Sequence, residues 1–167
     1  MAIDLYESTI PLLLHHLGSL DRLLDKAAEH AAACGFDPAN LLRARLSPDM
    51  FDLTRQIQIA TDQAKGCGAR LAGVEVPKFE DVETTIPELN ARIARTQDFL
   101  RSLDRAAIAG ADARPVSITI PGRTLEFTGK DYALTWVWPN FYFHYTMAYA
   151  LMRHNGVILG KRDYLGG

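Results

Sequence analysis

The chain has 167 residues, of which 48% are hydrophobic and 23% charged, and its formal net charge is −2. These values fit one soluble globular domain over residues 1–167, long enough to bury about two thirds of its extended surface. Without a basic run, nothing indicates a nucleic-acid partner. The start MAIDLYESTI is acidic where a signal peptide would be basic. Cys34 and Cys67 are too few for a disulfide or zinc framework, and both resemble helix-end thiols, so we expect a cytoplasmic protein.

The first predicted helix begins at Pro11, or is kinked there, and ends before Gly35. A glycine directly after the last periodic residue is a common helix C-cap. Apolar residues recur at alternating spacings of four and three, which is the pattern of one buried helical face. They are Leu13, Leu17, Leu20, Leu24, Ala27 and Ala31.

A short helical turn and a second long helix are expected next. Asp37-Pro38 places an N-cap before a proline and predicts the short turn through Arg43. Ser47-Pro48 repeats this signal and predicts the start of the second helix. Its apolar stripe consists of Leu53, Ile57, Ala60, Ala64, Cys67 and Leu71.

A loop, a third helix and a β-hairpin follow. The segment VEVPKFEDVE, rich in proline and acid, is expected to cross the surface as an extended loop. Thr85 and Glu88 predict a capping box at the start of the third helix, whose apolar stripe continues to Ala107. Between Arg114 and Gly129, the alternating segments VSITI and LEFTG are joined by PGRT and predict a hairpin that must pack on the helices.

The fourth predicted helix runs from about residue 131 to 155, with Pro139 as a kink or a restart. It carries no charged side chain between Trp136 and Arg153, a run long enough to span a bilayer. Polar residues such as Asn140 and His144 interrupt that run, and no clusters of lysine or arginine flank it. We therefore expect a core helix and no membrane association.

Two stripes run along this fourth helix. The inward stripe contains Val137, Phe141, His144, Ala148 and Leu151. The second, about 100° away, contains Trp138, Tyr142, Tyr145, Tyr149 and Met152. A helix that is apolar on two faces is buried on both. The second stripe could meet the hairpin, a small-molecule pocket or a second copy of the chain. The tail GKRDYLGG is expected to be solvated.

His144 is the central candidate for a functional residue. We favour a neutral core histidine hydrogen-bonded to a Thr, Tyr or Gln, and the alternative is a metal ligand or proton-transfer group. Zinc would require a ligand four residues later, where Ala148 stands. On the first helix, His15 and His16 are about 100° apart, so only His16 is expected to face inward. The candidate pocket residues are His144, His16, Gln56, Tyr145, Trp138 and Tyr149.

Three stretches together resemble a bacterial family known only as a domain of unknown function, a distant branch of the DinB/YfiT-like four-helix bundles. They are RLSPDMFDLTRQIQIATDQAKG, GVEVPKFEDVE and PNFYFHYTMAYALMRHNGVILGKRDYLG. The resemblance covers nearly the whole chain. It implies an up-and-down-type four-helix bundle with a long crossover connection, often dimeric. From this and the residue patterns above, we expect an all-α, DinB-like four-helix bundle with a small β-hairpin inserted before the last helix.

The same resemblance implies a metal site that this chain matches poorly. Better-known relatives use one histidine of the second helix and an HxxxH pair of the fourth, and some use the metal for thiol transfer or hydrolysis. His144 matches the first histidine of that pair, but Ala148 stands at the second, and residues 49–71 contain no histidine. Zn or Ni would therefore lack two of three ligands.

Three functions remain open from the sequence. The favoured one is a non-catalytic or small-ligand-binding domain with a degenerate metal site centred on His144. The second is a metal-dependent or histidine-based transferase or hydrolase of the DinB/YfiT type, which needs a cleft that brings solvent to His144. The third is a structural homodimer formed through the aromatic face of the fourth helix.

Overall fold

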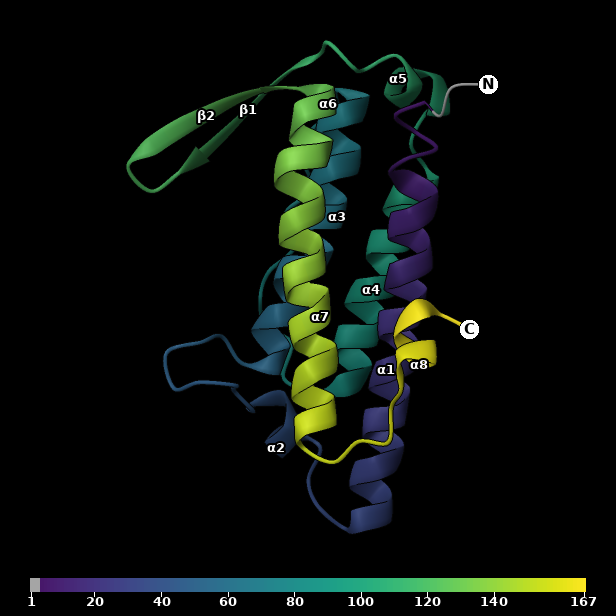
Figure 1. Ribbon diagram of the computed structural model, residues 1–167, viewed down its shortest axis with the longest axis vertical. Helices are drawn as coiled ribbons and strands as arrows, with labels where there is room; N and C mark the ends of the chain where they lie inside the picture. Colours follow the sequence, from purple (N-terminus) through teal and green to yellow (C-terminus); the bar gives the residue numbers. More distant parts are fainter. Residues whose placement is uncertain (1–3) are drawn as a thin grey trace.

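Four long helices lie side by side in the computed structural model, which describes residues 4–167 (Figure 1). They are α1 (Ile10–Cys34), α3 (Leu53–Ala72), α4 (Ile86–Arg101) and α7 (Trp138–His154). In Figure 1, α1 and α7 run downward while α3 and α4 run upward. The predicted all-α four-helix bundle is confirmed, and so is the hairpin before the last long helix.

Shorter elements connect the long helices. They are α2 (Ala39–Leu42), α5 (Arg105–Ala109), β1 (Pro115–Ile120), β2 (Arg123–Thr128), α6 (Gly129–Asp131), the π-helix η1 (Tyr132–Val137) and α8 (Lys161–Leu165). Because α3 and α4 run in the same direction, the connection over residues 73–85 returns along the bundle (Figure 1). This is the long crossover that the resemblance implies. Within residues 4–167, no helix combines the length and the apolar character that crossing a bilayer requires.

The first helix has the limits that its sequence predicts. Pro11 lies in its first turn, and Gly35 ends it with φ 74°, a left-handed conformation that glycine adopts at little cost. The Gly35 N–H donates to the carbonyls of Ala31 and Ala32. All six residues of the predicted stripe are buried, as its spacing requires.

The start of α3 differs from the prediction. Ser47 forms a local turn instead of a helix cap: its carbonyl accepts from the Met50 N–H at 3.0 Å and its hydroxyl donates to Asp49. Asp52 is the actual N-cap, and its carboxylate accepts from the Arg55 N–H at 2.9 Å. Prediction of a helix start at Ser47-Pro48 was wrong because an aspartate closer to the apolar stripe competes for the same role.

The two cysteines also differ from each other. Cys34 is the exposed last residue of α1, as expected of a helix-end thiol. Cys67 is instead fully buried within α3, where burial raises the pKa of its thiol to about 12. The expectation that both lie at helix ends was therefore wrong for Cys67, which is an inert core residue.

The capping box of α4 is confirmed, but the helix ends early. Thr85 accepts from the Glu88 N–H, and the Glu88 carboxylate accepts from the Thr85 N–H at 2.9 Å. The predicted stripe as far as Ala107 is broken because the chain turns after Arg101. Asp104 then caps the separate helix α5 by accepting from the Ala106 N–H at 3.0 Å.

The hairpin packs on the start of the last helix. Strands β1 and β2 are antiparallel, and Gly122 takes φ 84° in the turn between them. The Phe127 ring lies 6.1 Å from the Tyr132 ring and 6.0 Å from the Trp136 ring. Val116 and Ile118 of β1 are also buried, and the turn end of the hairpin extends away from the bundle (Figure 1). Elements α6, η1 and α7 follow one another without a loop (Figure 1). The π-helix ends at Val137 and α7 begins at Trp138 with Pro139 in its first turn, so Pro139 marks the predicted restart.

The predicted tail, residues 160–167, has no buried residue, as expected of a solvated segment, but it forms the short helix α8 instead of a loose end. Val157 and Leu159 are buried and lead the chain back to α8, which lies against α1. The Tyr164 ring is 4.5 Å from the Tyr145 ring, and the Tyr145 hydroxyl donates to the Tyr164 carbonyl. The second stripe of α7 is thus partly covered by α8 and not by the hairpin.

Candidate functional site

The predicted site residues fall into two groups around α7. Gln56 of α3 meets His144 on one side of α7. His16, Trp138, Tyr145 and Tyr149 belong to an aromatic cluster between α1, α7 and α8. No side-chain hydrogen bond joins the two groups within residues 4–167. The structure therefore does not assemble the six predicted residues into one pocket.

The pair formed by His144 and Gln56 has a defined hydrogen-bond direction. The Gln56 amide nitrogen donates to the Phe51 carbonyl at 3.2 Å, which turns the amide oxygen toward His144. That oxygen lies 2.7 Å from His144 Nδ1. An amide oxygen can only accept, so Nδ1 carries the proton and donates it. The second nitrogen, Nε2, keeps a lone pair.

Burial decides the charge of His144. The side chain is only 8% exposed. Burial and the positive charge of Arg55 lower the pKa of His144 to about 4. The imidazole is therefore neutral at pH 7, and it is a weak base there because a general base works best with a pKa near the working pH.

This depressed pKa predicts an acid-sensitive fold. The folded pKa lies below the ordinary value of 6.5, so protonation favours the unfolded chain. Above pH 6.5 the imidazole is neutral in both states and titration of His144 costs no stability. As the pH falls from 6.5 toward 4, the unfolded chain binds a proton that the folded chain does not, so the free energy of unfolding decreases. We expect the free energy of unfolding to fall by about 2 kcal/mol over this pH range. This is less than the pKa difference alone would give, because the ring keeps some contact with solvent.

Urea unfolding of the wild type and of His144→Asn at pH 7.0, 5.5 and 4.5 measures this loss. The variant lacks the titrating imidazole, so its free energy of unfolding is expected to fall less over the same range. Burial also lowers the pKa of His16, which remains in both proteins, so the difference between them isolates His144. Identical pH slopes would contradict this prediction.

The residues around His144 do not fit the metal site of the better-known relatives. Nδ1 donates to Gln56 and is not available as a ligand. Gln56 offers a neutral amide oxygen where zinc prefers nitrogen or sulfur, and Ala148 offers no donor. Among residues 4–167, no group of three or more His, Cys, Asp and Glu side chains could hold a metal ion.

The aromatic cluster on the other side of α7 is mostly packed, and a surface pocket of about 320 Å³ lies beside Tyr149 and Tyr164. His16 Nε2 lies 3.0 Å from the Tyr142 hydroxyl, and Trp138 stacks on Tyr142 at 5.1 Å between ring centroids. Tyr145 is buried, and the Tyr149 ring meets the Tyr164 ring at 5.5 Å. The expectation that His16 and not His15 faces inward is confirmed. The homodimer expected through this face stays a prediction.

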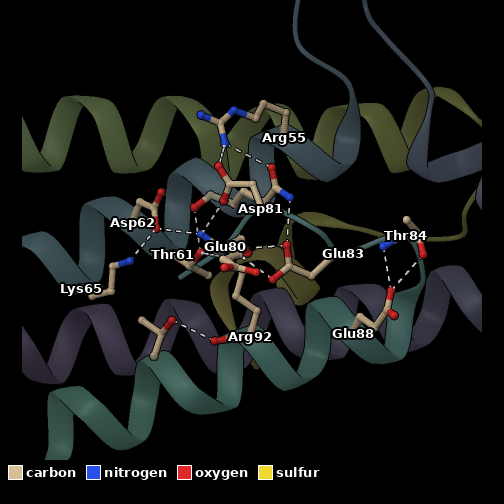
Figure 2. A network of polar contacts seen from close by, with 12 residues as sticks. Arg55, Thr61, Asp62, Lys65, Glu80, Asp81, Glu83, Thr84, Glu88 and Arg92 are labelled. Atoms are coloured by element: carbon tan, nitrogen blue, oxygen red, sulfur yellow. Dashed lines mark hydrogen bonds and ion pairs between the residues drawn. The ribbon is translucent and has the colours of Figure 1, made fainter. Parts of the chain in front are cut away.

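A buried arginine forms the most extensive polar contacts of the bundle. Arg92 of α4 lies next to the apolar stripe, and its side chain is completely buried. Its Nε donates to Thr61, its Nη1 to the Glu80 carbonyl and Glu83, and its Nη2 to Asp62, while Nη2 also lies 3.0 Å from an Asp81 carboxylate oxygen (Figure 2). Together with Arg92, these partners make up the Arg92 network: Thr61, Asp62, the Glu80 carbonyl, Asp81 and Glu83.

The Arg92 network fixes the crossover connection to α3 and α4. Asp81 and Glu83 lie on that connection, 3.0 and 3.1 Å from the Arg92 guanidinium. Glu83 also accepts from the Gln58 amide at 2.9 Å. The segment predicted as a surface loop is thus anchored by buried charge. One signal was visible in the sequence, since an arginine beside Ile93 in the third stripe needs acidic partners and EDVE supplies them.

Beside the Arg92 network lies a hollow of about 770 Å³, which we call the crossover hollow. Its walls are α3, residues 76–80 of the crossover connection, β1 and the start of the last helix. Its apolar lining includes Phe79, Ile118, Ile120 and Trp136. None of the six predicted pocket residues lines it.

Comparison with known proteins places the chain in a family of unknown function. Residues 5–165 match the family model described as "Domain of unknown function (DUF1993)". The chain is also similar to a protein from Shewanella denitrificans whose crystal structure, at 1.83 Å, is described as that of a DinB family member. The two are 42% identical, with 98% of this chain and 92% of that one covered and a TM-score of 0.88. None of the curated proteins matches.

Proposed function

The chain belongs to the DUF1993 family and has a DinB-like fold, and from this premise we propose that it is a small-ligand-binding bundle without metal-dependent catalysis at His144. The observation that carries the proposal is the hydrogen bond between His144 and Gln56. Gln56 is the residue of α3 that meets His144, and it occupies Nδ1 of the imidazole. Only Nε2 remains as a metal ligand, and one ligand does not hold zinc tightly.

The crossover hollow supports the ligand-binding part of the proposal. Its volume of about 770 Å³ lies within the range of small-molecule sites, which is about 300–1,000 Å³. One of its walls belongs to the connection that the Arg92 network holds in place. A wall that is already fixed reduces the ordering cost of binding.

A second candidate function is a histidine-based enzyme. One observation favours it: Gln56 fixes the tautomer of His144 so that Nε2 is the basic nitrogen. The pKa of about 4 opposes it, because an imidazole with so low a pKa is a weak general base at neutral pH.

Metal analysis tests the proposed function. Protein purified without a His-tag, incubated with Zn²⁺ or Ni²⁺ and dialysed, is expected to hold less than about 0.1 ion per chain. His144→Ala and the control His154→Ala, at the exposed end of α7, are expected to give the same value. Stoichiometric metal in the wild type that disappears only in His144→Ala would overturn the proposal and revive a metal-dependent enzyme.

A further inference from the structure

We infer that the crossover hollow binds an organic anion with an apolar or aromatic body. The inference rests on the proposed ligand-binding function and adds to it a site and a chemical class. Four features of the hollow carry it: the balance of charge, the free guanidinium of Arg70, the glycine that makes room for it, and the apolar wall.

The polar lining of the hollow is cationic on balance. Three cations, Lys65, Arg70 and Lys78, face two carboxylates, Asp62 and Glu80. The Asp62 carboxylate is already shared, since Oδ1 lies 3.0 Å from Lys65 Nζ and 2.8 Å from the Arg92 guanidinium in the network of Figure 2. An entering anion therefore meets an excess of positive charge.

Arg70 is the half-buried cation that is free to bind it, whereas Lys78, also without an ion pair in the described part of the chain, is exposed. Within residues 4–167 its guanidinium makes no ion pair, and its one side-chain hydrogen bond goes from Nη1 to the Tyr132 hydroxyl at 3.1 Å. Four further N–H donors remain on the group. Guanidinium binds carboxylate, phosphate and other oxyanions through paired hydrogen bonds. A half-buried arginine without an acidic partner is thus a ready anion site.

Gly66 leaves the space that the Arg70 guanidinium occupies. It lies one turn before Arg70 in the interior of α3, where glycine costs about 1 kcal/mol relative to alanine. A Cβ atom at position 66 would lie 2.4 Å from Arg70 Nη1. The missing side chain therefore lets Arg70 fold back over its own helix toward Tyr132 and the hollow.

The other walls suit an apolar body. Phe79 is held by three cations, since Arg95 Cζ, Lys65 Nζ and Arg92 Cζ lie 3.6, 4.1 and 5.7 Å from the centre of its ring. Ile118 and Ile120 of β1 and the Trp136 ring complete the apolar lining. A ligand with a charged end at Arg70 and a hydrophobic remainder satisfies both kinds of surface.

Two fluorescent probes of the same shape test the charge requirement. The anionic probe is 8-anilinonaphthalene-1-sulfonate, and the neutral one is N-phenyl-1-naphthylamine, which lacks the sulfonate. The wild type is expected to bind one anionic probe per chain. Arg70→Gln is expected to raise its Kd about tenfold, as the loss of one charged hydrogen bond does, and to change the Kd of the neutral probe less than about twofold.

Gly66→Ala tests whether the position of the Arg70 guanidinium matters, because it moves this group without removing its charge. The clashing atoms belong to the far end of a flexible side chain, so Arg70 moves and the helix stays folded. We expect affinity for the anionic probe to fall severalfold while the urea midpoint stays equal or rises. The matched control is Gly18→Ala in α1, where a Cβ meets nothing nearer than 3.5 Å. It is expected to leave binding of both probes unchanged.

The outcomes separate the inference from the proposed function. An anionic probe that binds equally to the wild type, Arg70→Gln and Gly66→Ala would overturn the anion site. Preference of the wild type for the neutral probe would do the same, while ligand binding as such would stand. If neither probe binds the folded wild type, the anion site and the ligand-binding function both fail.

Discussion

Replacing Arg92 with methionine is expected to lower the free energy of unfolding by about 3–5 kcal/mol. The guanidinium is fully buried and lies within 3.1 Å of carboxylate oxygens of Asp62, Asp81 and Glu83. Methionine fills a similar volume but leaves these three carboxylates close together without their shared cation. Urea unfolding at pH 7, followed by circular dichroism, gives the change directly.

Arg101→Met is the matched control for this prediction. Arg101 lies on the same helix and makes an i,i+3 ion pair with Asp98, but both side chains are more than half exposed. Exposed pairs of this kind contribute about 0.5 kcal/mol or less. A loss in Arg92→Met as small as the loss in Arg101→Met would show that the Arg92 network does not hold the crossover connection.

Gly129→Ala is expected to destabilise the fold by about 3 kcal/mol, the upper end of the range for overpacked sites. A Cβ atom at position 129 would lie 2.1 Å from the backbone oxygen of Ala111. That backbone has little freedom to move, since the Ala111 carbonyl accepts from the Arg114 N–H and the next carbonyl accepts from the Lys130 N–H, each at 3.0 Å. The substitution therefore strains the base of the hairpin.

A second glycine in the same region supplies the comparison. Gly110 has φ −91°, which any residue adopts, and a Cβ there meets nothing nearer than 3.7 Å. Gly110→Ala is expected to be neutral or to stabilise the fold by about 0.5 kcal/mol through the unfolded chain. Thermal unfolding of both variants measures the contrast, and equal melting temperatures would contradict the predicted clash at Gly129.

The features that could be predicted well from the sequence depend on residues close to one another in the chain. Helical spacing alone requires that the stripe of α1 be buried and that His144 face inward, and both hold in the structure. The capping box at Thr85 and the turn at Gly122 depend on neighbouring residues and are also confirmed. The start of α3 was missed because two capping signals, Ser47 and Asp52, lie five residues apart and only packing decides between them.

The candidate site was predicted only in part, for a different reason. His144 and Gln56 were both candidates, and the structure brings them together because each faces the bundle core. The crossover hollow was missed because its lining comes from four separate segments, around Arg70, Phe79, Ile118 and Trp136, which only the tertiary fold brings together. The burial of Tyr145 by α8 likewise depends on where a tail returns, which no spacing in the sequence specifies.

The π-helix η1 has a consequence for how the last helix meets its surroundings. A π-helical turn contains more residues than an α-helical turn. The side chains of η1 and those of α7 therefore do not follow one common helical period, although the two helices are continuous. Those after Pro139 are set by the bundle core, whereas Tyr132 and Trp136 are set by Arg70 and the hairpin. One continuous rod therefore lines the crossover hollow at Trp136 and the bundle core farther along.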